Sequence, residues 1–116
     1  MNFAFSEEQQ ELRAVVRRFL AEKSPEPEVR RLMETVPGYD ADVWRLAASQ
    51  LGLTGLAIPE KFGGSGFGYA ELTVVFEEMG RVLLCAPFFA SVALAANLLL
   101  STDDEIAKAE IGRAHV

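Results

Sequence analysis

The strongest constraint on the fold of this chain is an apolar run from Ala86 to Leu100. At about 15 residues, the run is shorter than the roughly 20 residues that a helix needs to cross a bilayer. Pro87 suits the first turn of a helix, because its missing N–H would have no partner there in any case. We therefore predict a helix from Phe88 to Leu100. Because this helix is apolar nearly all round, we expect protein to cover both of its sides.

A first helix is predicted near the N-terminus. Ser6 is a good N-cap, and Gln9 can complete a capping box with it. The Ser24-Pro25 pair ends the helix. Its apolar stripe consists of Leu12, Val15, Val16, Phe19 and Leu20, and Arg13, Arg17, Arg18 and Glu22 are expected on the other side.

Between residues 25 and 59 the pattern predicts two shorter helices. Val29, Leu32, Met33 and Val36 fit a short helix that the Pro37-Gly38 turn would end. Asp40 is a good N-cap for the next helix, and Gly52 stands where a left-handed residue would end it. The apolar stretch from Leu53 to Pro59 could be extended, but it is isolated and predicts no sheet.

A strongly patterned helix follows the glycine-rich loop Lys61–Gly68. Thr102 and Glu105 form a second possible capping box, which would start a last helix at Asp103 and let Gly112 break it. The fold class is therefore all-α, a helical bundle of about five to six helices with a central apolar helix. In the helix after the loop, Leu72, Val75, Phe76, Met79, Val82 and Leu83 are expected on one side, and Glu71, Glu77, Glu78 and Arg81 elsewhere.

The last six residues, Ile111 to Val116, do not resemble the rest of the chain. They read like the translation of a common sequencing-library adapter. We therefore expect residues 1–110 to form the domain and 111–116 to be an artefact tail, the alternative being a genuine C-terminus. The only histidine, His115, lies in this tail and supports neither a metal site nor a general base.

Composition excludes several classes of protein. The formal net charge is −6 without a basic segment, which argues against binding to nucleic acid or to an anionic membrane. The single cysteine, Cys85, cannot form an internal disulfide, and the N-terminus lacks a signal-peptide pattern, so a cytoplasmic location is expected. With 116 residues the chain suffices for one domain.

No self-sufficient catalytic site is visible. The glycine-rich loop lacks both the Gly-x-Gly-x-x-Gly and the Gly-Lys-Ser/Thr patterns, so a compact turn explains its glycines. Cys85 has no histidine to activate it and is expected to be a buried structural thiol. Glu77 and Glu78 are adjacent and should diverge on a helix. The acidic residues 103–105 fit a helix N-terminus and lack the spacing of a metal site.

The order of several short motifs resembles the N-terminal domain of acyl-CoA dehydrogenases over roughly residues 3 to 110. The motifs are Phe-Ser-Glu-Glu-Gln-Gln-Glu-Leu-Arg ending at Arg13, Leu51-Gly52-Leu53, Gly-Leu-Ala-Ile-Pro-Glu ending at Glu60, Phe-Gly-Gly-Ser-Gly ending at Gly66, and Glu-Glu-Met-Gly-Arg ending at Arg81.

This resemblance implies a three-domain flavoenzyme. Members of the family bind FAD, oxidise an acyl-CoA to the 2,3-enoyl-CoA, and usually pass electrons to an electron-transfer flavoprotein. Their catalytic glutamate belongs to a C-terminal helical bundle that is absent here, so no catalytic residue is assigned and the fragment is expected to be inactive. A homo- or hetero-oligomer is expected. The segment from Cys85 to Ser91 resembles a subgroup that includes heteromeric enzymes acting on steroid side chains.

The resemblance also implies that the helix from Phe88 to Leu100 borders the acyl chain. Phe89, Val92, Ala93 and Ala96 are the expected pocket-wall residues, and ordinary core packing is the alternative for each. Two other functions stay open at this point: a flavin monooxygenase or acyl-CoA oxidase on the same scaffold, and a stand-alone helical binding module. The choice between a fatty acyl and a steroid substrate also stays open.

Overall fold

The structure is a computed structural model that describes the backbone of residues 4–115 and the side chains as far as Ile111. The described part contains helices and no strand, so the all-α prediction is confirmed. The α-helices are α1 (Glu7–Lys23), α2 (Glu26–Met33), α3 (Ala41–Ser49), α4 (Tyr69–Arg81), α5 (Ala96–Leu100) and α6 (Glu105–His115). Two 3₁₀ turns, η1 (Leu53–Gly55) and η2 (Glu60–Phe62), precede α4, and a π-helix, η3 (Phe89–Ala95), runs directly into α5.

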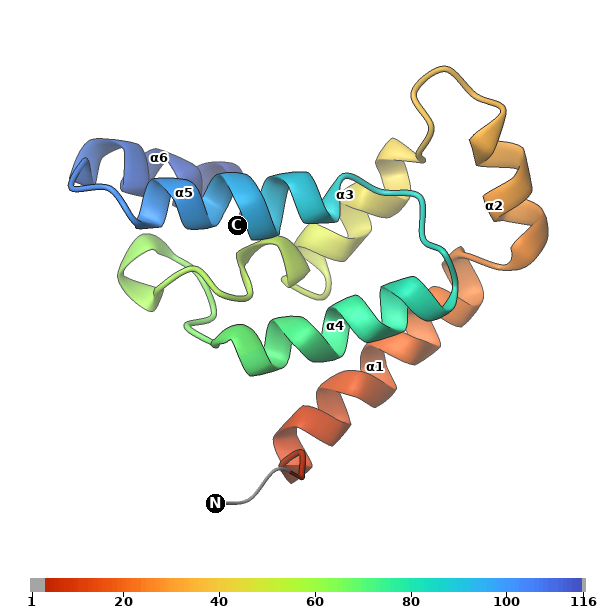
Figure 1. Cartoon of the computed structure of the whole chain (residues 1–116), viewed down its shortest axis with the longest axis horizontal. Helices are drawn as coiled ribbons and strands as arrows, with labels where there is room; N and C mark the ends of the chain where they lie inside the picture. The colour runs from red at the N-terminus through yellow and green to blue at the C-terminus, as the bar shows by residue number, and fades with distance from the viewer. Residues whose placement is uncertain (1–3, 116) are drawn as a thin grey trace.

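Helices α1 and α4 lie side by side and form the main helix pair, as Figure 1 shows. The apolar stripes predicted for them provide buried residues on both sides, among them Val16 and Leu20 from α1 and Leu72 and Val75 from α4. Each such aliphatic side chain contributes about 1.5–3 kcal/mol by leaving water. The apolar periodicity of the two helices therefore accounts for their pairing.

Phe88 connects the α1–α4 pair to α3 and to the segment that follows. Its ring meets Trp44 of α3 edge-on at 6.3 Å between centroids and Phe76 of α4 at 5.1 Å. Edge-to-face contacts of this kind add about 0.5–1.5 kcal/mol to the burial of the rings. With Phe88 2% exposed, these contacts hold the start of the apolar helix against the core.

The predicted helix boundaries are largely confirmed by their caps. The Ser6 hydroxyl accepts a hydrogen bond from the Gln9 backbone at 3.2 Å, and the Gln9 side chain accepts one from the Ser6 backbone at 2.9 Å. The Asp40 carboxylate accepts from the amides of Asp42 and Val43. Gly52 adopts the expected left-handed conformation with φ 63°.

The last helix differs from its prediction at both ends. Asp104, rather than Thr102, is its cap, because the Asp104 carboxylate accepts from the Ala107 amide at 2.9 Å. Helix α6 therefore begins at Glu105, and its backbone continues past Gly112 to His115. A glycine inside a helix costs only about 1 kcal/mol relative to alanine, which does not suffice to end it.

The expectation that protein covers both sides of the apolar helix is wrong for the chain as it stands. Figure 1 shows α6 beside the helix that η3 and α5 form. Phe89, Leu94 and Leu98 are 60%, 55% and 70% exposed. No described helix is long and apolar enough to span a membrane.

Candidate functional site

Between α4 and the apolar helix the chain makes a tight turn. The amide of Leu83 donates to the carbonyl of Gly80 and the amide of Leu84 to that of Met79, which together form a Schellman motif. Leu83 occupies the left-handed position of this motif with φ 54°, where glycine is usual. A leucine in this conformation costs about 1–2 kcal/mol. Leu83 was expected on the apolar side of the helix, but the turn places its side chain outside, 71% exposed.

The first half of the apolar helix is a π-helix, a feature that the sequence pattern did not predict. The amide of Ala96 donates to the carbonyl of Ser91, five residues earlier. In an α-helix two residues five apart differ by about 140° in direction. Bonding from i to i+5 instead brings such residues to the same side. Phe89 and Leu94 therefore share one side of η3.

Leu98 lies in α5, four residues after Leu94 at the end of η3, and so continues this side. We call Phe89, Leu94 and Leu98 the apolar ridge. The opposite side of the same helix carries Phe88, Val92 and Ala96, which are 2–3% exposed and belong to the core. The chain thus has a helix with one buried apolar side and one open apolar side.

The four predicted pocket-wall residues are divided between these two sides. Phe89 lies on the apolar ridge and Ala93 is half-buried. Val92 and Ala96 point into the core of the domain. The structure does not bring all four to one surface, because the π-helical register separates Phe89 from Val92 and Ala96.

The segment that carries the ridge is uncharged. No charged residue occurs from position 82 to position 102. The polar side chains of α5 and its end bond to backbone: the Asn97 amide donates to the Ala93 carbonyl at 2.7 Å and the Ser101 hydroxyl to the Asn97 carbonyl at 2.8 Å. The nearest charges that follow α5 in the sequence are acidic, at Asp103, Asp104 and Glu105.

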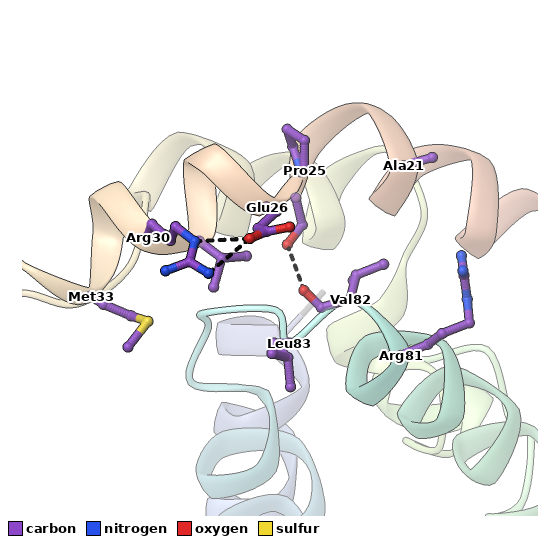
Figure 2. Close-up of a pocket in the computed structure, with 10 residues that line it drawn as sticks. Ala21, Pro25, Glu26, Arg30, Met33, Arg81, Val82 and Leu83 are labelled. Carbon is purple, nitrogen blue, oxygen red and sulfur yellow. Dashed lines mark hydrogen bonds and ion pairs between the residues drawn. The ribbon is translucent and has the colours of Figure 1, made fainter.

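Several hollows open on the surface of the described chain, and three of them are considered in turn. The largest, about 600 Å³, lies between the end of α1, α2 and the end of α4, with Met33 and Leu83 at its edge and the Glu26–Arg30 ion pair beside it (Figure 2). A hollow of about 220 Å³ includes Phe89, and one of about 330 Å³ includes Tyr69. None of the three is lined by Val92, Ala93 or Ala96.

The glycine-rich loop folds back on the segment before it. The amides of Ser65, Gly66 and Phe67 donate to the carbonyls of Gly55, Ile58 and Leu56 at 2.9–3.0 Å. A phosphate or pyrophosphate group needs backbone amides that are free to point at it. The loop therefore does not fit the pyrophosphate of FAD, and the interpretation of its glycines as a compact turn is consistent with these bonds.

An ion cluster around a buried carboxylate joins α1 to α4, and the sequence pattern did not predict it. Glu78 was expected on the polar side of α4, but it is 1% exposed. Its carboxylate accepts hydrogen bonds from Arg17 at 2.7 Å and Arg13 at 2.8 Å, and from Arg81 at 3.3 Å. The hydrogen bonds from these guanidinium groups, Arg17 first, hold the pKa of Glu78 at about 2 despite its burial.

The remaining titratable groups do not form a reactive site. Arg13 also binds the exposed Glu77 at 2.7 Å, so both carboxylates of the pair are occupied by ion pairs. Cys85 is half-buried rather than fully buried, and its thiol donates a weak hydrogen bond to the Leu83 carbonyl at 3.8 Å. The described residues contain no group of three or more potential metal ligands. The spacing of Arg13 and Arg17, one helical turn apart on the side facing Glu78, is the signal that could have revealed the cluster.

Comparison with known proteins identifies the family to which this chain belongs. Residues 6–111 match the family described as acyl-CoA dehydrogenase, N-terminal domain. The acyl-CoA dehydrogenase IpdE2 of Mycolicibacterium smegmatis is 43% identical over 109 residues, which cover 93% of this chain and 32% of that protein. FadE27 of Mycobacterium tuberculosis, also an acyl-CoA dehydrogenase, is 31% identical over 99 residues, or 85% of this chain and 26% of that protein.

Solved structures show the same fold. A chain of the ChsE4-ChsE5 complex from Mycobacterium tuberculosis superposes with a TM-score of 0.87 at 28% identity, covering 99% of this chain and 31% of that one. A variant of the steroid ACAD Tcur3481-Tcur3483 superposes with a TM-score of 0.83 at 27% identity, covering 91% of this chain and 29% of that one. The chain thus spans about a third of the length of the relatives it matches.

Proposed function

The chain belongs to the acyl-CoA dehydrogenase family, as its N-terminal helical domain, and on that premise we propose that it is the first part of an enzyme that oxidises an acyl-CoA to the 2,3-enoyl-CoA. The observation that carries the proposal is the family match over residues 6–111. The open apolar side of η3 and α5 supports it, because such a surface is typical of a domain that packs against further protein or an apolar ligand.

In this proposal the domain supplies apolar wall and packing surface rather than chemistry. Phe89, Val92, Ala93 and Ala96 border the acyl group, Phe89 directly and the buried Val92 and Ala96 by supporting the helix from behind. Neither Glu77 nor Glu78 serves as the base. A carboxylate held at a pKa of about 2 by arginines is too weak a base to remove an α-proton. The chain alone is therefore expected to be inactive.

The family generally binds FAD, and we propose FAD as the cofactor of the full-length protein. No described residue is assigned to it, since the amides of the glycine-rich loop are already bonded within the domain. We further propose an electron-transfer flavoprotein as the electron acceptor. The similarity to a chain of the ChsE4-ChsE5 complex favours a hetero-oligomer over a homo-oligomer.

A direct test compares the full-length gene product with the 116-residue chain. The full-length protein should purify with flavin absorbance that bleaches when an acyl-CoA is added without oxygen, and the short chain should show neither signal. A colourless full-length protein would refute the proposal.

Two alternatives give different results in the same experiment. An acyl-CoA oxidase or a flavin monooxygenase on this scaffold would consume oxygen rapidly during turnover, whereas a dehydrogenase would need an added electron acceptor. A stand-alone binding module would have a natural stop codon near position 110, with no further domain encoded after it.

A further inference from the structure

We draw no further inference here: the strongest candidate, the hollow of about 600 Å³ between the end of α1, α2 and the end of α4, carries none, because its charged side chains are already paired within the chain and nothing in the structure shows what covers its exposed apolar edge.

Discussion

At the scale of single residues, the side chain that is tolerated at two positions depends on neighbours that lie far away in the chain or across a turn. Gly64 must lack a side chain because of the Ile58 carbonyl, and Glu78 must be ionised because of arginines on another helix. Both residues would look unremarkable in a helix or loop considered alone. Each supports a prediction.

Gly64→Ala should unfold more easily than the wild type by more than about 2 kcal/mol. The added Cβ would lie 2.1 Å from the backbone oxygen of Ile58, which cannot move without breaking the bond it accepts from Gly66. Urea unfolding measures the change. Gly80→Ala is the control: nothing lies within 4 Å of a Cβ there, so it should stabilise α4 by about 0.5–1 kcal/mol. Equal effects of the two changes would contradict the closed-loop geometry.

Glu78→Gln should destabilise the chain by about 1.5–3 kcal/mol, because the buried side chain loses its charge-assisted hydrogen bonds to Arg13 and to the half-exposed Arg17. Glu77→Gln, at a carboxylate that is half exposed, should change stability by less than about 1 kcal/mol. Chemical unfolding at neutral pH provides both values. A loss in Glu78→Gln no larger than that in Glu77→Gln would refute the role of the cluster.

The same cluster predicts a pH dependence. The pKa of Glu78 is lowered from 4.5 to about 2 in the folded chain. Its contribution to stability is therefore complete above pH 4.5 and is lost as the pH falls from 4.5 towards 2. The free energy of unfolding of the wild type should fall more steeply in this window than that of Glu78→Gln. Parallel curves for the two proteins would show that another group titrates instead.

At the scale of secondary-structure elements, the decisive feature is the register of η3. The sequence pattern predicted a helix over residues 88–100, and the structure confirms a helix there. The pattern could not predict which residues face outward, since Phe, Leu, Val and Ala are all apolar and the turn length changes within the helix. The ring of Phe88, which contacts Trp44 and Phe76 edge-on, holds the start of this helix against the core.

The division of this helix into a buried and an open side can be tested with two truncations in the isolated chain. Val92→Ala should lower stability by about 1–3 kcal/mol, because Val92 is 3% exposed in the core. Leu94→Ala should change it by less than about 1 kcal/mol, although more apolar surface is removed, because Leu94 is on the open side. Thermal or urea unfolding compares them. The reverse order of effects would contradict the assignment of Val92 to the core and Leu94 to the open side.

At the scale of the whole molecule, the domain has more apolar surface than it can bury by itself. The apolar ridge adds to Leu83, Met33 and Ile106, which are also largely exposed. Such a surface suits a domain that corresponds to about a third of its relatives. It also makes the isolated chain prone to associate.

We therefore expect the isolated chain to self-associate as its concentration rises, and Leu94→Ser with Leu98→Ser to reduce this without loss of helix content. Static light scattering measures the association and circular dichroism the helix content. Ser91→Ala, in the same helix, provides a variant that should leave the association unaltered. If the double variant associates as strongly as the wild type, a surface other than the apolar ridge causes the association.

The sequence by itself determined the helices, most of their ends and the family. Helical periodicity and capping residues act within a few positions, as Ser6 with Gln9 and Asp40 with Val43 illustrate, so they can be recognised locally. The order of motifs along the chain was likewise visible without a structure. The absence of a catalytic base among these residues stays a prediction that the ion pairs of Glu77 and Glu78 support.

Only the tertiary structure decided how these helices divide their residues between core and surface. Glu78 is buried because Arg13 and Arg17 approach from α1, a contact between residues more than sixty positions apart. The π-helical register of η3 likewise does not follow from residue type, since the residues of this helix are almost all apolar. The apolar run that limited the possible folds therefore has one buried and one open side. The physical reason is that apolar character only allows a residue to be buried. Packing geometry decides which of the apolar residues are buried.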